Sequence, residues 1–199
     1  MEAVITILSY LIGSIPTGFI LGKAAGVDVR TAGSGNIGAT NVARVMGKGH
    51  GLLTLIADVA KGLLPVLVAR QMAFSDAAVA VVGAAAFLGH LFPVFLKFRG
   101  GKGVATAFGV LLALAPQAMW VPLVAFIAAV VVSRRVSLGS ICAAVAAPLA
   151  LWFFSYPMPL TALAAFLAAF VIARHHANIK RLLAGSEPRF GERAESQET

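Results

Sequence analysis

The feature that most constrains the fold of this chain is a series of apolar runs, each close to the length that crosses a lipid bilayer. A transmembrane helix needs about 20 mostly apolar residues. Because hydrophobic residues make up 59% of the chain and charged residues only 12%, most of its length belongs in lipid and a separate soluble domain has no room. The runs lie at about 4–21, 52–71, 77–96, 104–116, 118–133, 137–155 and 160–174.

These runs predict an all-α integral membrane protein with seven transmembrane helices. Residues 1–199 then form one membrane-embedded domain, of which residues 183–199 are a polar cytoplasmic tail. The first run is interpreted as a helix and not as a signal peptide, because it lacks a basic start and carries Ser14 and Pro16 late in a long apolar stretch. The single cysteine, Cys142, excludes an internal disulfide.

The positions of Lys and Arg predict how residues 104–133 are arranged. A single helix of this length would measure about 45 Å, more than the bilayer core of about 30 Å, and Pro116 offers a turn near its middle. Positive charge stands at both ends, at Lys102 on one side and at Arg134 and Arg135 on the other. Cytoplasmic loops carry the excess of Lys and Arg, so the stretch is predicted to be a hairpin of two short helices.

The same rule predicts the orientation of the whole chain. All Lys and Arg residues except Lys61 and Arg70 fall on the cytoplasmic side if the N-terminus is outside and the C-terminus is inside. Three long polar segments then face the cytoplasm, whereas the outer connections are short. The formal net charge of +8 suits anionic lipid headgroups or phosphorylated substrates, and burial in the membrane argues against a nucleic-acid partner.

The first cytoplasmic segment, residues 32–44, is rich in glycine and short polar side chains. Gly33 to Gly38 match a G-x-G-x-x-G pattern, and Asp58 follows at the usual distance. The match is not a dinucleotide fingerprint, because a membrane helix and not a β-strand precedes it. Small residues still allow backbone N–H groups to converge on an oxyanion, and a flexible linker is the alternative. Further donors are Ser34, Asn36, Thr40 and Asn41.

The second segment, residues 89–106, combines three cations with four glycines between two apolar runs. Glycine removes the Cβ atoms that keep a ligand away from the backbone, and the helix that follows would present its positive end. The segment is not a nucleotide P-loop, since Leu96 and Gly103 replace the first glycine and the Ser/Thr of that motif. A basic cytoplasmic loop is the alternative, and His90 fits either a packing or a catalytic role.

The third segment, residues 174–189, would bring His175, Asn178 and Leu182 to one face if the last helix continued through it, with Arg174 and Arg181 on another face. A basic amphipathic tail lying on anionic lipid would account for the charges. That alternative leaves His175 and Asn178 unexplained.

Two further groups of ionisable residues bear on the site. Asp58 and Lys61 are three residues apart in the second apolar run, where a lone charge costs roughly 2.5–3.5 kcal/mol, so we expect them to form a structural salt bridge; a direct substrate role is the alternative. The adjacent His175 and His176 would diverge by about 100° on a helix, and no suitably spaced ligand completes a set. We therefore predict no metal site.

Together the three segments resemble the three cytoplasmic motifs of the bacterial acyl-phosphate-dependent glycerol-3-phosphate acyltransferases. The motifs are Gly33-Ser34-Gly35-Asn36-Ile37-Gly38-Ala39-Thr40-Asn41, then Gly89-His90-Leu91-Phe92-Pro93 with Gly100-Gly101-Lys102-Gly103-Val104-Ala105-Thr106, and Arg174-His175-His176-Ala177-Asn178-Ile179-Lys180-Arg181-Leu182. The resemblance covers nearly the whole chain. It implies a multi-pass enzyme of the bacterial inner membrane, in contact with membrane lipid and with its active site facing the cytoplasm. Such an enzyme moves a fatty acyl group from acyl phosphate to the 1-hydroxyl of glycerol 3-phosphate, giving lysophosphatidic acid and inorganic phosphate, the first step of phospholipid synthesis. No cofactor is expected.

With that chemistry in view, we expect Arg44, Lys102 and His175 to grip phosphate, together with glycine N–H groups of the first two segments. Ser34 and Asn178 are expected to orient the reacting groups while a substrate phosphate oxygen accepts the proton; His90, His175 and Glu187 are the alternative bases. The predicted catalytic residues are Ser34, Asn178, Lys102 and His90. The predicted phosphate-binding residues are Gly33, Gly35, Asn36, Gly38, Asn41, Arg44, Gly100, Gly101, Lys102, Gly103 and His175, with Asp58, Lys61, Lys97 and Glu187 in support.

A transporter or flippase for an anionic lipid or phosphate compound is the alternative function. It would use the same cations, but transporters usually show internal repeats and helices broken near the middle of the membrane, and the sequence shows neither clearly. The His-x4-Asp pair of other acyltransferases is also absent, because no Asp follows any of the histidines at that spacing.

Overall fold

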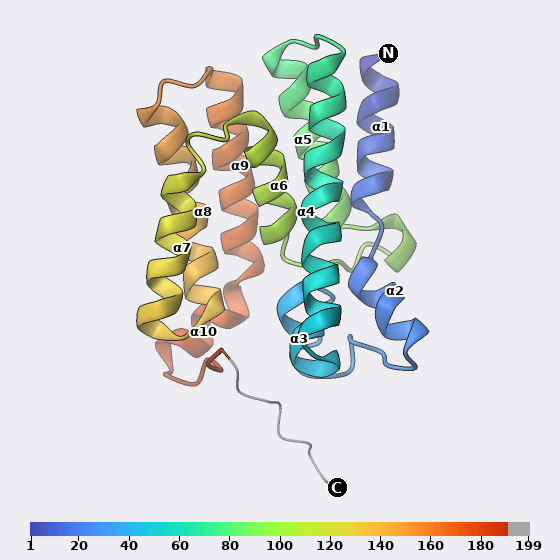
Figure 1. The fold of residues 1–199 in the computed structure, drawn as a ribbon, viewed down its shortest axis with the longest axis vertical. Coiled ribbons are helices and arrows are strands. Elements are labelled where there is room, and N and C mark those ends of the chain that lie inside the picture. The colour runs from blue at the N-terminus through green and yellow to red at the C-terminus, as the bar shows by residue number, and fades with distance from the viewer. Residues whose placement is uncertain (191–199) are drawn as a thin grey trace, which may run out of the picture.

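A computed structural model describes residues 1–190, and within them every regular element is a helix (Figure 1). The final residues of the predicted polar tail, 191–199, lie outside the described part of the chain. The helices are α1 (Glu2–Gly13), α2 (Thr17–Ala24), α3 (Ala39–Met46), α4 (Lys48–Gln71), α5 (Asp76–Leu91), η1 (Val94–Leu96), α6 (Val104–Leu114), α7 (Trp120–Ser133), α8 (Val136–Phe153), α9 (Met158–Arg174) and α10 (His176–Leu183).

Four stretches of the described chain are long and apolar enough to cross a membrane. These are Glu2–Ala24, Lys48–Gln71, Asp76–Leu96 and Val136–Phe153, and α9 with α10 makes a fifth if the bent pair is counted as one span. The helices α6 and α7 are apolar but shorter. The predicted break between them is confirmed, and their connection lies at the end of the bundle away from α10 (Figure 1).

The first apolar run differs from the single helix expected, because it breaks between α1 and α2. Pro16 has no N–H to donate and its ring blocks a continuous helix. The break leaves the carbonyl of Ile15 without its usual helical partner, and Lys61 Nζ of α4 donates to that oxygen at 3.0 Å. A buried cation on a neighbouring helix therefore supports the break.

Glycines allow the central helices to pack closely. A Cβ atom on Gly13 of α1 would lie 2.0 Å from the carbonyl oxygen of Ala86 in α5, and one on Gly109 of α6 would lie 2.1 Å from the carbonyl oxygen of Val59 in α4. Small residues at helix contacts are typical of membrane bundles, where association depends on close van der Waals packing. These contacts fix α1, α4, α5 and α6 as the frame from which the polar segments extend.

Candidate active site

A polar cavity of about 150 Å³ brings the three motif segments together. Residues from the first loop, from the loop before α6, and from the α9–α10 junction all face it, although they are far apart in the sequence. The lining combines small polar residues with three cations. The lining residues are Ser34, Gly35, Asn36, Gly100, Lys102, Arg174, Ala177, Asn178 and Arg181.

The first loop is ordered by one buried amide, that of Asn41 on α3. Its Nδ2 donates to the carbonyl oxygens of Val29, Ala32 and Asn36 at 2.8–3.1 Å, and its Oδ1 accepts from the backbone N–H of Ser34 at 2.8 Å. Asn41 is only 2% exposed. Asn41 was predicted to bind phosphate, but its hydrogen-bonding groups are used inside the loop, so we assign it to shaping the loop.

The glycine N–H groups of the first two segments were expected to bind phosphate, but many backbone N–H groups near the cavity already have protein acceptors. A Cβ atom on Gly100 would lie 2.1 Å from the carbonyl oxygen of His90, and one on Gly101 would lie 2.2 Å from the ring Nε2 of His90. Close packing therefore excludes a side chain at either position. Gly33, Gly35 and Gly103 have φ of 60°, 69° and 83°, which favours glycine. The N–H groups already engaged are those of Ser34, Gly35, Gly38, Gly100 and Gly101.

Arg174, at the end of α9, holds the second loop. Its guanidinium donates to the carbonyl oxygens of Gly100 at 2.9 Å and Gly101 at 3.1 Å, and it lies 5.7 Å from the ring centre of Phe92. Arg174 also lines the cavity. Sequence analysis placed it on a separate helix face and did not include it in the site.

Lys102 is the cation of the second loop that faces the cavity. Its Nζ donates to Asn178 Oδ1 at 2.6 Å. Burial lowers the pKa of Lys102 to about 8, and the positive charges of Arg181 and Arg44 act in the same direction while Glu187 opposes them. An anion in the cavity would relieve this crowding of positive charge, so the charge of the cavity suits an anionic ligand.

The third segment bends by 60° between α9 and α10, with His175 at the bend. The continuous helix assumed from the sequence is therefore wrong, and Asn178 and Arg181 line the cavity together. His175 is 2% exposed and its Nδ1 contacts the carbonyl oxygen of Val171 at 2.7 Å. A carbonyl oxygen can only accept, so Nδ1 carries a proton and Nε2 is the acceptor of the neutral ring.

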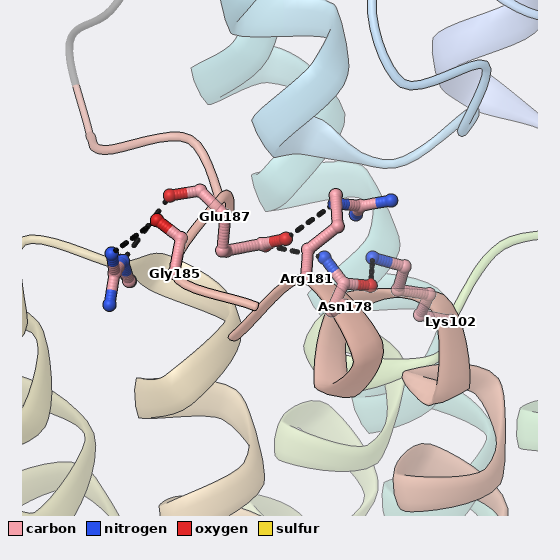
Figure 2. Close-up of polar contacts among 6 residues, drawn as sticks. Lys102, Asn178, Arg181, Gly185 and Glu187 are labelled. Atoms are coloured by element: carbon pink, nitrogen blue, oxygen red, sulfur yellow. Dashed lines mark hydrogen bonds and ion pairs between the residues drawn. The ribbon is translucent and has the colours of Figure 1, made fainter. Parts of the chain in front are cut away.

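Glu187 completes the polar chain behind the cavity (Figure 2). Its Oε1 accepts from Asn178 Nδ2 at 2.6 Å and its Oε2 accepts from Arg181 Nε at 2.7 Å. Burial acts to raise the pKa of this carboxyl, but the neighbouring hydroxyl of Ser137, the bonds from Asn178 and Arg181, and the charge of Arg181 outweigh it and keep the pKa below its ordinary value. Glu187 is therefore a carboxylate that orders two cavity residues.

His90 lies behind the second loop with Asp58 and Lys61, outside the cavity lining described above. Asp58 and Lys61 form the predicted salt bridge, at 2.8 Å and with both side chains about 5% exposed, which confirms their pairing. His90 Nδ1 lies 3.7 Å from Asp58 Oδ1, and its Nε2 faces Gly101. This position suits support of the loop.

Two other predicted site residues lie at the edge of the site. Arg44, on α3, is close enough for its charge to act on Lys102. Lys97 is exposed at the end of η1, where its φ of 51° turns the chain. Neither is among the residues that line the cavity.

Comparison with known proteins places this architecture in a family. Residues 3–185 match the family model described as glycerol-3-phosphate acyltransferase. The glycerol-3-phosphate acyltransferase of Trichlorobacter lovleyi is 54% identical over 182 residues, covering 92% of this chain and 94% of the relative. That of Thermosynechococcus vestitus is 46% identical over 198 residues, covering 94% of each.

Two crystal structures of PlsY, an integral membrane glycerol 3-phosphate acyltransferase, have the same fold. The glycerol 3-phosphate form is 42% identical and superposes with a TM-score of 0.92 over 96% of both chains. The lysophosphatidic acid form is also 42% identical, with a TM-score of 0.89 over 96% of this chain and 95% of that one. The chain is a membrane protein that belongs to the glycerol-3-phosphate acyltransferase family.

Proposed function

We propose that this protein transfers a fatty acyl group from acyl phosphate to the 1-hydroxyl of glycerol 3-phosphate at the cytoplasmic face of the bacterial inner membrane. The products are lysophosphatidic acid and inorganic phosphate. The observation that carries the proposal is the cavity in which three motif segments gather Lys102, Arg174 and Arg181. The related PlsY structures, a glycerol 3-phosphate form and a lysophosphatidic acid form, support the acceptor and the product.

The proposal includes the topology of a single membrane-embedded domain with seven spans. In addition to the stretches that meet the length test, α6, α7 and α9 each cross the membrane, the N-terminus is outside, and α3 and α10 lie at the cytoplasmic face. The support is charge, because cations from the second and third motif segments line one cavity together with the loop of the first segment. Short spans are accommodated by local thinning of the bilayer at modest cost.

Phosphate binding is assigned mainly to side chains and not to glycine N–H groups. Lys102, Arg174 and Arg181 line the cavity, with Arg44 close behind them. His175 is removed from the predicted phosphate-binding set, because its neutral ring uses its one N–H on the carbonyl oxygen of Val171. Charge-assisted bonds to phosphate are worth about 1.5–3 kcal/mol each. Several cations around one small cavity match two substrates that both carry phosphate.

The reaction needs orientation more than a strong protein base. The glycerol hydroxyl oxygen attacks the acyl carbonyl carbon, the bond from that carbon to the phosphate oxygen breaks, and phosphate leaves with the electron pair. Among the protein candidates, Glu187 is occupied by two donors, His90 lies behind the loop, and His175 is buried and is not among the residues that line the cavity. We therefore assign the hydroxyl proton to a substrate phosphate oxygen, whose second pKa is near 6, with Ser34 and Asn178 orienting the groups.

An apolar groove is assigned to the acyl chain. It has a volume of about 340 Å³ and lies where the α1–α2 break faces η1, with Ile15, Pro16, Phe19, Ile20, Phe95 and Leu96 as its lining. Leu96, which lines the groove, is four residues before Gly100, which lines the polar cavity. An Ile20→Trp change should narrow the groove and shift preference toward shorter acyl phosphates by about threefold to tenfold in kcat/KM. Ile12→Trp, on the exposed face of α1, is the control, and equal preferences in the two variants would refute the assignment.

Purified protein in detergent tests the proposed function. Acyl phosphate with labelled glycerol 3-phosphate should give labelled lysophosphatidic acid, while acyl-CoA and acyl carrier protein as donors should give none. Product formed without closed compartments also excludes a pure transporter. Folded protein that forms no product from acyl phosphate, or that prefers acyl-CoA, would overturn the proposal.

A further inference from the structure

The amide of Asn178 is held between two groups of opposite charge. Its Oδ1 accepts from the ammonium of Lys102 at 2.6 Å, and its Nδ2 donates to the carboxylate of Glu187 at 2.6 Å (Figure 2). Asn178 and Glu187 are 6% and 8% exposed. Little water is therefore present to replace either partner.

These two partners allow only one orientation of the amide. A carboxylate only accepts hydrogen bonds and an ammonium only donates them. Turning the amide over would set the oxygen of Asn178 against the carboxylate of Glu187 and its NH2 group against Lys102, which breaks both bonds and makes two repulsive contacts. The atom of Asn178 on the Lys102 side, where the cavity lies, is thus an acceptor.

Glu187 is itself held in place by a residue from another part of the chain. We call residues 185–190 the C-terminal strap; Gly185, with φ of 71°, reverses the chain after α10. Arg135, at the start of α8, donates to the carbonyl oxygens of Glu187 at 3.2 Å and Gly185 at 3.3 Å. The backbone N–H of Phe190 donates to the carbonyl of Arg134. The α7–α8 turn therefore anchors the strap.

Resting on the proposed function, we propose that Glu187 is a positioning residue which, anchored by Arg135, fixes the Asn178 amide with its oxygen toward the cavity. Asn178 then accepts hydrogen bonds there, from Lys102 at rest and from the hydroxyl of bound glycerol 3-phosphate before it attacks. As the attack proceeds, the hydroxyl proton passes to the substrate phosphate oxygen. It does not donate to a phosphate oxygen. Phosphate is left to the cations, and the α7–α8 turn becomes part of the catalytic geometry without touching substrate.

A double-mutant cycle tests this proposal. Glu187→Gln replaces the carboxylate by an amide that can also donate, so the Asn178 amide is no longer fixed; kcat should fall about ten- to a hundredfold while KM for glycerol 3-phosphate changes less than about threefold. In an Asn178→Ala background the same change should cost less than about twofold, because its effect acts through Asn178. An equal loss of kcat in both backgrounds would overturn the proposal.

The anchor is tested with a matched pair of neighbours. Arg135→Gln should lower kcat about threefold to tenfold, again only when Asn178 is present, whereas Arg134→Gln should leave kcat unchanged because Arg134 meets the strap through its backbone carbonyl. If Glu187→Gln does not fold, as judged by thermal unfolding in detergent, the comparison of Arg135→Gln with and without Asn178 tests the proposal by itself. Unmodified protein is assayed alongside: no product from it refutes the proposed function, whereas active protein with additive variants refutes only this inference.

Discussion

Two charged clusters in this protein contain similar residues but differ in how their charges are balanced. Inside the bundle, the ammonium of Lys61 meets the carboxylate of Asp58 at 2.8 Å and a carbonyl oxygen at 3.0 Å. At the cavity, Lys102, Arg174 and Arg181 are three lining cations, and within residues 1–190 this cluster includes one carboxylate, Glu187, which is paired with Arg181. The inner cluster is closed on itself, whereas the outer cluster has surplus positive charge. The comparison indicates that an unbalanced charge beside a cavity, more than the residue type, marks a binding site.

The largest expected effect is on the stability of the inner cluster. Lys61→Met removes the cation and leaves the carboxylate of Asp58 buried without compensation, which costs about 3–5 kcal/mol of folding free energy. We expect a large loss of thermal stability and of folded protein in detergent. A Lys61→Met/Asp58→Leu double variant should recover most of that stability, because no buried charge remains; a double variant as unstable as the single one would contradict this account.

The same substitution at the cavity should have the opposite pattern. Lys102→Met removes one of several crowded cations, so the unfolding temperature should be unchanged or slightly raised. Activity should fall by about a hundredfold or more in kcat/KM, equivalent to loss of one or two charge-assisted bonds. Steady-state kinetics and thermal unfolding of the same preparation measure both effects. A variant that loses stability and activity together would mean that the two clusters do not differ in the way proposed.

The pH dependence sharpens the contrast, because Lys102 has a pKa of about 8 instead of its usual 10.5. One unit above that value only about a tenth of the free protein keeps the proton, whereas one unit below it about nine-tenths does, so KM for glycerol 3-phosphate should rise about tenfold from pH 7 to pH 9. The folding free energy should become more favourable over the same change. Between about pH 8 and 10.5 the unfolded chain binds the proton of Lys102 more tightly than the folded chain does, so the folded state gains stability as pH rises while substrate binding weakens. The KM dependence should vanish in Lys102→Met, which serves as the control.

The smallest change is expected for a substitution at Gly101, which lies in the second loop and packs against His90 beside the inner cluster. Gly101→Ala would set its methyl group 2.2 Å from Nε2 of His90, which should displace the second loop and lower kcat/KM about tenfold. Combining it with His90→Ala creates space and should restore part of the activity. If His90 were the catalytic base, the double variant would be less active than Gly101→Ala alone, so the same pair of measurements separates the two roles.

The sequence predicted the membrane class, the apolar runs and the three segments that meet at the cavity, because these depend on composition and local motifs. It did not predict the break at Pro16 within the first span, since the compensating cation, Lys61, lies on another helix. The use of the Asn41 amide inside its own loop was also missed, because three backbone acceptors meet it only after folding.

The division of the third segment into two helix faces was the largest error in the site prediction. Residues 174, 178 and 181 are spaced i, i+4 and i+7 and so share one face of a helix, and all three line the cavity. A useful signal was present in the sequence, since cations at positions 174 and 181 flank the Asn within the third motif. The salt bridge of Asp58 and Lys61 was predictable because both residues lie on one helix, three positions apart.

Arg174 has two roles. Its side chain lines the cavity, and its guanidinium also donates to the carbonyl oxygens of Gly100 and Gly101. An inhibitor that places an anionic group against Arg174 would therefore be difficult to escape by mutation. Any substitution that weakens the inhibitor there also releases the loop on which Lys102 stands, so resistance would come with a loss of the enzyme's own activity. Contacts with the exposed Lys97 offer no such protection.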